Sequence, residues 1–232
     1  MRVRIIMKPD RPVWLKKNVN EGITAFTYRA IRESDKRFGD MLHNQGYTLG
    51  YKSFRYFTYS RLMYKHTSID KFLPDEKIEF QISSPIDDII INFVKGAQRM
   101  GHIILYGHAI PLQEIARVKD DYKFNDGGLF KLISPAVMMV KSKAVEEAGM
   151  DKYIINNLIE KYYTLNKKMP KSLHMAIRLM NNTKCSIIYK ESNYTGYTGT
   201  IAMNENPELI QMAYQAGIGS KNGQGCGMIE TF

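Results

Sequence analysis

Apolar and polar residues in the first half of the chain follow two different spacings. Some segments alternate between polar and apolar side chains, as residues 77–82 do, and this pattern is typical of a strand buried on one face. Others place apolar side chains three and four residues apart, which predicts helices that pack on a sheet. The predicted strands are 2–8, 54–59, 77–82, 103–106 and 110–118, and the predicted helices begin near residues 20 and 86. This order of elements is that of a ferredoxin-like unit.

The same order of elements recurs in the second half, after a polar segment at 119–128 that marks a domain boundary. The predicted strands are 129–140, interrupted at Ser134-Pro135, then 173–189, 197–203 and 226–231, and the predicted helices are 145–163 and 208–216. The pattern therefore predicts an α+β fold with two tandem ferredoxin-like (RRM-like, βαββαβ) domains, at residues 1–120 and 121–232. Two such domains leave a cleft between their sheets.

A break is expected within the first helical region. Ser34-Asp35 has the residue types of a new helix N-cap, and Phe38, Met41 and Leu42 then form the apolar face of a second short helix. The chain is predicted to turn at this point.

The end of the chain is rich in glycine, with five glycines in the segment 217–227. Glycine adopts positive φ without steric cost, so a glycine cluster between a helix and a strand suggests a backbone cradle for phosphate. The cluster is not a P-loop, because a P-loop follows a strand and opens a helix. A flexible glycine-rich turn is the alternative.

Charge narrows the class of partner. Lys and Arg outnumber Asp and Glu by 33 to 23, giving a net charge of +10 and a pI near 9.4. This excess favours a polyanion: nucleic acid first, an anionic membrane surface second.

Cysteine usage and the N-terminal residues bear on the compartment. Cys185 and Cys226 stand far apart without metal-ligand spacing, so they are expected to be reduced thiols. The first residues alternate like a strand, which argues against a signal peptide, and no apolar run is long enough to span a membrane. A cytoplasmic protein with no membrane partner is predicted.

Several motifs together resemble a known family. Gly217-Ile218-Gly219, a polar stretch and Gly225-Cys226-Gly227 resemble the C-terminal glycine-rich motif of the RAMP superfamily of CRISPR-associated RNA-binding proteins. Leu42-His43, followed by the aromatic strand at 54–59, resembles the start of the Cas-six-type CRISPR repeat-processing endoribonucleases. Residues 132–137 resemble the Leu-Ser-Pro strand that opens the second domain of that family.

The resemblance implies a metal-independent endoribonuclease that cuts CRISPR repeat RNA in precursor transcripts to generate guide crRNAs. In this family the 2′-hydroxyl attacks its own phosphate and leaves a 2′,3′-cyclic phosphate, which requires an acid, a base and a cation. His43 is the candidate acid or base because imidazole titrates near neutral pH, Tyr28 is the candidate orienting or donating group, and Lys52 is the candidate cation. The division of roles between Tyr28 and His43 stays open.

Geometry provides a check on this site. On one straight helix, Tyr28 and His43 would lie roughly 22 Å apart, too far to share a phosphate. The predicted break at Ser34-Asp35 is therefore necessary for the site. No cofactor or metal is expected, since acidic pairs such as Asp87-Asp88 are explained by caps and turns.

The expected RNA contacts combine the glycine-rich segment with scattered basic residues. The predicted RNA-binding residues are Gly217, Gly219, Lys221, Asn222, Gly223, Gln224, Gly225, Gly227, Arg29, Arg32 and Lys131. CRISPR repeat RNA is the predicted partner, and a homodimer or other subunits of a CRISPR effector complex are further candidates. A non-catalytic RNA-binding RAMP subunit and a basic interaction module without RNA chemistry are the alternative functions.

Overall fold

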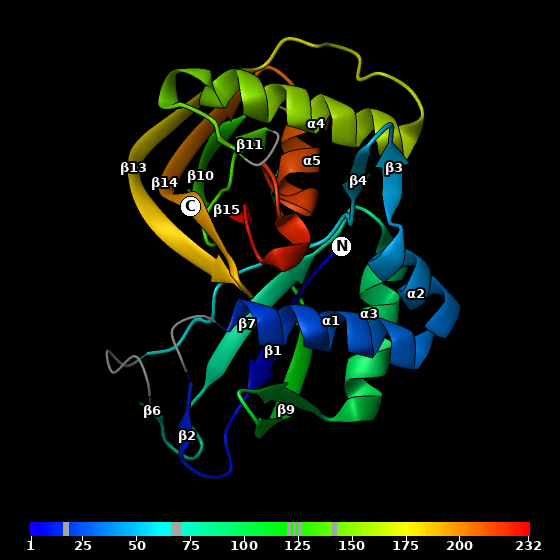
Figure 1. Ribbon diagram of the computed structural model, residues 1–232, viewed down its shortest axis with the longest axis vertical. Helices are drawn as coiled ribbons and strands as arrows, with labels where there is room; N and C mark the ends of the chain where they lie inside the picture. The colour runs from blue at the N-terminus through cyan, green and yellow to red at the C-terminus, as the bar shows by residue number, and fades with distance from the viewer. Residues whose placement is uncertain (16–18, 66–70, 120–121, 123, 125–126, 141–142) are drawn as a thin grey trace.

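The computed structural model describes residues 1–15, 19–65, 71–119, 122, 124, 127–140 and 143–232. They form two antiparallel sheets, one from each half of the chain, with helices packed on them (Figure 1). The predicted boundary between residues 120 and 121 lies outside the described residues.

The first sheet has the strand order of a ferredoxin-like unit with one added strand. In spatial order its strands are β5 (Thr58–Tyr59), β7 (Ile78–Ser83), β1 (Arg2–Met7), β9 (His108–Arg117) and β8 (His102–Leu105). The strand β1 lies between β7 and β9 and pairs antiparallel with both. The added strand β8 forms a hairpin with β9 at the edge of the sheet.

Three helices accompany this sheet: α1 (Asn20–Ser34), α2 (Lys36–Asn44) and α3 (Asp87–Met100). The apolar faces of α1 and α3 are buried, and Phe26 of α1 meets Phe93 of α3 edge to face at 5.7 Å between ring centroids. The predicted break between α1 and α2 is confirmed. Asp35 is extended there, and its side chain accepts a hydrogen bond from the Phe38 amide at 2.9 Å.

The second sheet repeats the topology without the added strand. In spatial order its strands are β13 (Ala176–Tyr189), β14 (Ser192–Asn204), β10 (Gly128–Leu132) and β15 (Ile229–Thr231). Its helices are α4 (Met150–Asn166) and α5 (Pro207–Ala216). Both halves therefore have the predicted order of elements, and the predicted α+β fold class is confirmed.

Three two-stranded ribbons complete the described strands. They are β2 (Val13–Trp14) with β6 (Lys71–Phe72), β3 (Tyr47–Leu49) with β4 (Lys52–Phe54), and β11 (Met139–Val140) with β12 (Lys143–Ala144). A 3-10 turn, Glu147–Gly149, precedes α4. A second, Asn222–Gln224, lies within the glycine-rich segment.

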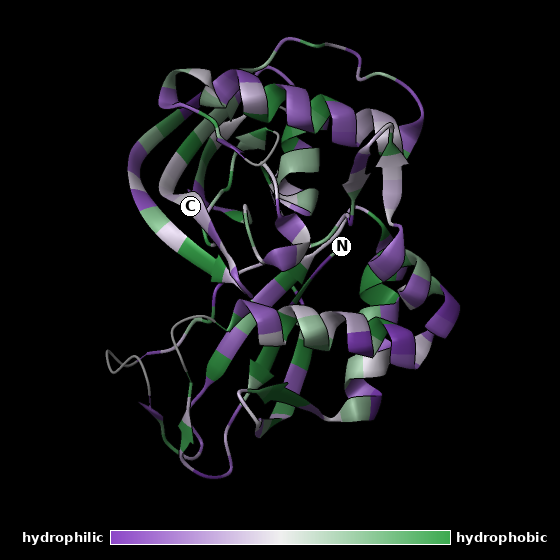
Figure 2. Cartoon of the chain, in the orientation of Figure 1, coloured by the Kyte–Doolittle hydropathy of each residue, from purple (hydrophilic) through white to green (hydrophobic). Residues whose placement is uncertain are grey.

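The two halves share one hydrophobic core. A single cluster of buried side chains includes Phe57 and Phe80 from the first half and Phe130 and Ile218 from the second. Hydrophobic and hydrophilic residues alternate along the ribbons of α1 and α4, as expected for helices with one buried face (Figure 2). This shared core fixes the position of one half relative to the other.

One predicted strand is wrong. Residues 54–59 do not form a continuous strand: β4 ends at Phe54, β5 begins at Thr58, and Tyr56 between them has φ of +51°. Tyr56 and Phe57 are both buried, and neighbouring residues on a regular strand point to opposite faces. The chain bends here so that both aromatic rings enter the core.

A second strand is shorter than predicted. The segment 129–140 is not one strand, since β10 ends at Leu132 and β11 begins only at Met139. The break falls at the predicted interruption, where the Ser134 hydroxyl accepts from the Met228 amide at 2.9 Å.

Among the described residues, none of the helices combines the length and apolar character needed to cross a bilayer.

Candidate active site

A cavity of about 610 Å³ lies between the two halves of the molecule. Its walls come from α1, α2, the β3–β4 ribbon, α4, the tip of the β13–β14 hairpin and the glycine-rich segment. Residues with polar or aromatic side chains in its lining include Thr24, Tyr28, His43, Lys52, Arg55, Tyr153, Lys161, Tyr189, Lys190, Lys221, Asn222 and Gln224. A mixed aromatic and basic lining suits a ligand that carries both rings and negative charge.

Tyr28 and His43 meet at this cavity. The turn at Asp35 folds α2 back, and the two rings pack edge to face with 4.7 Å between their centroids. The second neighbour of Tyr28 is Phe57, at 5.4 Å between centroids. The break between the helices therefore brings Tyr28 and His43 close together, as the proposed site requires. Two side chains from different helices can act on one group.

The environments of the two rings differ. Burial raises the pKa of the Tyr28 hydroxyl to about 12, although the nearby Arg55 guanidinium opposes this shift. Tyr28 is therefore protonated at neutral pH and can donate a hydrogen bond. His43 is exposed, and its Nδ1 lies 3.0 Å from the Asn44 Oδ1.

Arg55 secures the chain around His43. Its guanidinium donates to the His43 carbonyl at 3.1 Å and to the Gln45 carbonyl at 3.0 Å, and it also contacts the Ser53 hydroxyl. The end of α2 is thereby tied to the β3–β4 ribbon. Sequence reasoning missed Arg55, although it stands within the aromatic segment that was singled out.

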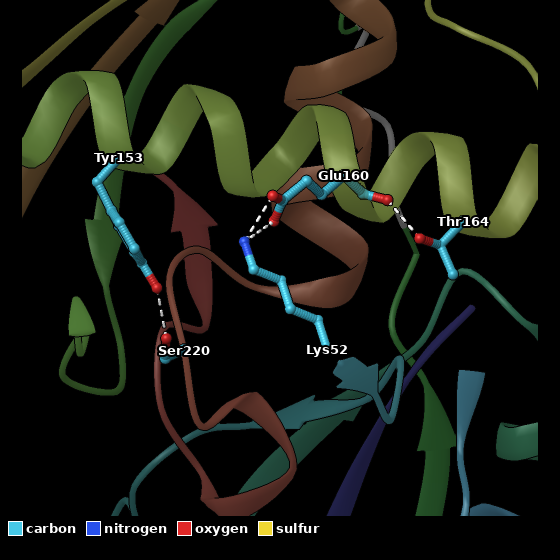
Figure 3. Close-up of polar contacts among 5 residues, drawn as sticks. All are labelled: Lys52, Tyr153, Glu160, Thr164 and Ser220. Atoms are coloured by element: carbon cyan, nitrogen blue, oxygen red, sulfur yellow. Dashed lines mark hydrogen bonds and ion pairs between the residues drawn. The ribbon is translucent and has the colours of Figure 1, made fainter. Parts of the chain in front are cut away.

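Lys52 faces the second half of the chain. Its ammonium donates to both carboxylate oxygens of Glu160 on α4, at 2.5 and 2.7 Å (Figure 3). Burial lowers the pKa of Lys52 and the Glu160 carboxylate raises it, with a net increase, so the ammonium stays charged. The candidate cation thus lies at the cavity, held by a carboxylate that the sequence did not point to.

The glycine-rich segment divides into buried and cavity-lining parts. Gly217, Gly225 and Gly227 are buried outside the cavity lining, and their amides donate to the carbonyls of Ala213, Asn222 and Pro135 respectively. The cavity is lined instead by Gly219, Lys221, Asn222, Gly223 and Gln224. At Gly227, with φ of +76°, a Cβ would lie 2.0 Å from the Ile218 carbonyl oxygen.

The scattered basic residues lie elsewhere. Arg29 and Arg32 are exposed on α1 and Lys131 is exposed on β10, and none of the three lines the cavity. Arg32 forms an ion pair with Asp40 of α2, with 2.7 Å between Nε and Oδ1. The structure does not bring these residues together with Tyr28, His43 and Lys52.

Lys161 was also missed. Its side chain is 2% exposed, and its ammonium donates to the Gly217 and Gly219 carbonyls and to the Asn222 side chain. The sequence carried a signal for it, because Lys161 shares the helical spacing of Ile154, Leu158 and Leu165 on the inward face of α4.

The described part of the chain contains no cluster of side chains with the composition of a metal site. There, no three His, Cys, Asp or Glu side chains gather closely enough to hold an ion. The cavity lining combines His43 with several tyrosines and with five basic side chains: Lys52, Arg55, Lys161, Lys190 and Lys221.

Two ferredoxin-like halves with a basic, aromatic cavity between them define an α+β protein whose cavity suits an anionic ligand. Two family models match this chain: "CRISPR-associated protein Cas6, N-terminal" over residues 16–116 and "CRISPR associated protein Cas6, C-terminal" over residues 118–231. The chain belongs to the Cas6 family of CRISPR-associated proteins, within the RAMP group that its motifs resemble.

Curated relatives agree with this assignment. A CRISPR-associated endoribonuclease Cas6 from Pyrococcus furiosus is 26% identical over 248 residues, covering 100% of this chain and 90% of the relative. The CRISPR-associated endoribonuclease Cas6 1 of Methanocaldococcus jannaschii is 24% identical and covers 99% of this chain and 92% of the relative.

Solved structures share the fold. A Cas6-related protein from Pyrococcus furiosus superposes with a TM-score of 0.84 at 18% identity, covering 100% of this chain and 98% of the other. A structure described as a RAMP protein binding different RNA substrates superposes with a TM-score of 0.83 at 17% identity, covering 100% and 99%.

Proposed function

We propose that the chain is a metal-independent endoribonuclease that binds CRISPR repeat RNA and cuts it to release guide RNAs. The contact between Tyr28 and His43, in the lining of a cavity that Lys52 also lines, is the observation that carries this proposal. The activity named for the two curated relatives supports it. The net charge of +10 suits an RNA partner.

The proposed reaction is transfer of the phosphoryl group within the RNA. A bond forms between the 2′-oxygen and phosphorus while the bond from phosphorus to the 5′-oxygen breaks. One proton leaves the 2′-hydroxyl and one reaches the leaving oxygen, and His43 carries out one of these transfers. The products are a 2′,3′-cyclic phosphate and a 5′-hydroxyl.

Tyr28 and Lys52 take supporting roles in this proposal. Because burial raises the pKa of Tyr28 to about 12, its hydroxyl is a poor base, and we assign it to orienting the substrate through a donated hydrogen bond. The Lys52 ammonium would stabilise the extra negative charge on the phosphorane. Glu160 holds this ammonium at the cavity until a phosphate arrives.

The glycine-rich segment is the proposed RNA contact from the second half. Lys221, Asn222, Gly223 and Gln224 line the cavity next to α1, where the Asn20 side chain donates to the Gln224 carbonyl at 3.0 Å. The Lys221 ammonium lies 4.9 Å from the centre of the Tyr194 ring. Charge and amide groups at this wall would hold phosphates, while nearby aromatic rings offer stacking surfaces.

The test is cleavage of a labelled CRISPR repeat RNA in excess EDTA. Wild type is compared with His43→Ala, and with a substrate that has a 2′-deoxynucleotide at the cut site. We expect wild type to cut, with a loss of about 10²–10⁴-fold in His43→Ala and no cutting of the deoxy substrate.

The matched control is His174→Ala, which removes an exposed histidine outside the cavity lining. It should cut like wild type. Tight binding by wild type without any cutting would contradict the enzyme and favour the non-catalytic RNA-binding RAMP subunit. Binding without RNA preference and lost in moderate salt would favour the basic interaction module.

Three finer predictions belong to this proposal. We expect the protein to work in the cytoplasm, and we retain a homodimer and a complex with other effector subunits as candidate assemblies. Light scattering during size-exclusion chromatography, with and without repeat RNA, would distinguish a monomer from a homodimer.

A further inference from the structure

The ammonium of Lys161 lies at the centre of the glycine-rich segment. Its three donated hydrogen bonds go to the Gly217 carbonyl at 2.7 Å, the Gly219 carbonyl at 3.0 Å and the Asn222 Oδ1 at 2.8 Å. An ammonium carries three hydrogens, so this side chain is fully satisfied by a single stretch of chain.

The arrangement explains how an irregular segment keeps one conformation. Gly217, Gly219 and Lys221 all have positive φ, and no regular helix or strand spans Gly217 to Lys221 to align their carbonyls. A buried ammonium is stable only when it is hydrogen-bonded, so Lys161 and the carbonyls that surround it depend on one another. The Asn222 side chain adds to this by donating to the Ile218 and Cys226 carbonyls.

The helix α4 also holds the opposite wall of the cavity. Glu160, next to Lys161, binds Lys52 of the first half, and the Tyr56 hydroxyl donates to the Lys161 carbonyl at 2.5 Å. About two turns before Glu160 on α4, the Tyr153 hydroxyl shares a hydrogen bond of 2.5 Å with the Ser220 hydroxyl (Figure 3). A single helix therefore contacts both the candidate cation and the glycine-rich segment.

None of the three hydrogen bonds that the Lys161 ammonium donates goes to a carboxylate. Its acceptors are two carbonyls and one amide, while the carboxylate of the neighbouring Glu160 is held by Lys52. When Lys161 is protonated, its ammonium therefore adds positive potential next to the part of the glycine-rich segment that carries Lys221.

We propose that Lys161 is a positioning residue for RNA binding: its ammonium holds residues 217–222 in the conformation that presents Lys221 to Gln224 to the cavity. The effect on RNA binding rests on the proposed function, but the conformation of residues 217–222 can be measured without RNA. In this proposal Lys161 does not contact the reacting atoms and takes no part in proton transfer; it acts through residues 217–222.

The first experiment measures hydrogen–deuterium exchange in the free protein. Lys161→Met keeps a side chain of similar length but removes the charge and all three donors. We expect amides in 217–227 to exchange at least about tenfold faster than in wild type, a local opening, while β1 and α3 stay protected. Unchanged exchange in this segment would overturn the inference.

The second experiment measures RNA binding and cleavage separately. With the repeat RNA, Lys161→Met should raise KM at least about tenfold and leave kcat within about threefold, because binding is lost while the reacting groups stay in place. A fall in kcat at unchanged KM would contradict a positioning role in RNA binding. If wild type neither binds nor cuts RNA, the proposed function fails, while the exchange result still decides the positioning.

Two further variants complete the design. Lys152→Met, on the exposed side of the same helix, removes the same charge from the protein and should behave like wild type in both assays. Lys161→Arg keeps a charged donor and should lie closer to wild type than Lys161→Met. Loss of the whole fold in both Lys161 variants would contradict the inference, since the ammonium would then stabilise the protein as a whole.

Discussion

The two halves of the molecule share one topology but elaborate different connections. In the first half, the chain after the first helix is extended by α2 and the β3–β4 ribbon, while Gly101 alone joins α3 to β8. In the second half, α5 is joined to β15 by residues 217–228, which contain the glycine-rich segment. The two extended connections meet at the same cavity.

The difference shows how one fold can supply two kinds of wall. The first half presents side chains, with an exposed His43 against a largely buried Tyr28. The second half presents a compact stretch of backbone, fixed from beneath by Lys161. Since the sheets are alike, the candidate chemistry lies in the connections, as is common where a rigid scaffold carries functional loops.

The largest expected effect is on the free energy of unfolding, when one glycine in each connection is replaced by alanine. Gly227→Ala would place a Cβ 2.0 Å from the Ile218 carbonyl oxygen at positive φ, so strain and overpacking add. We expect a loss of about 2–5 kcal/mol in the free energy of unfolding, measured with urea.

Gly101→Ala is the matched control in the first half. It has the same sign of φ, at +68°, but a Cβ there meets no atom within 4 Å. Only the backbone strain remains, so we expect a loss of about 1 kcal/mol. Equal losses for the two glycines would remove the contrast between a packed and an open connection.

The next effect is a pH dependence that belongs to the second half. Burial lowers the pKa of Lys161 from 10.5 to about 7, and the Glu160 carboxylate opposes this. Between these values the unfolded chain holds a proton that the folded protein lacks, so stability rises with pH. Wild type should gain up to about 1.4 kcal/mol per pH unit relative to Lys161→Met in this range.

Urea unfolding of both proteins at several pH values from about 6 to about 9 measures this difference. Below about pH 7 the difference should become constant, because both folded and unfolded Lys161 are then protonated. A difference that falls as pH rises would contradict the sign of the shift.

A smaller effect is expected from the helix cap in the first half. Asp35→Ala removes the side chain that accepts from the Phe38 amide, and such a loss costs about 1 kcal/mol. Because this cap fixes the turn that brings His43 to Tyr28, cleavage should fall more than RNA affinity does. The control is Glu33→Ala, an exposed acidic residue two positions earlier, which should leave cleavage unchanged.

The smallest effect separates the two sets of basic residues predicted from the sequence. Arg32 is half exposed and paired with Asp40, so Arg32→Ala should cost at most about 1 kcal/mol and change RNA affinity by less than about twofold. Lys221→Ala, at the cavity, should weaken binding more and reduce its salt dependence. Equal effects on binding would place RNA over α1 as well.

Much of the fold could be predicted from local patterns. The alternating segment at 77–82 and the helical spacing in α1 and α3 reflect side chains that face one common core, so their burial is written along the chain. The break at Asp35 followed from a cap residue. For the candidate site, this break and the choice of Tyr28, His43 and Lys52 depended on local motifs and on the family resemblance.

What the sequence determined by itself was the order of elements, the turn after α1 and the positive charge, since each depends on neighbouring residues or on composition. The tertiary structure alone decided that Tyr56 and Phe57 bend the chain, that Glu160 holds Lys52, and that Lys161 satisfies the glycine-rich segment. The bend depends on burial of both rings in the core, and the two lysine contacts join residues far apart in the chain, 108 positions for Lys52 and Glu160 and 56 for Lys161 and Gly217. Their energies arise only when the chain has packed and water is excluded around them.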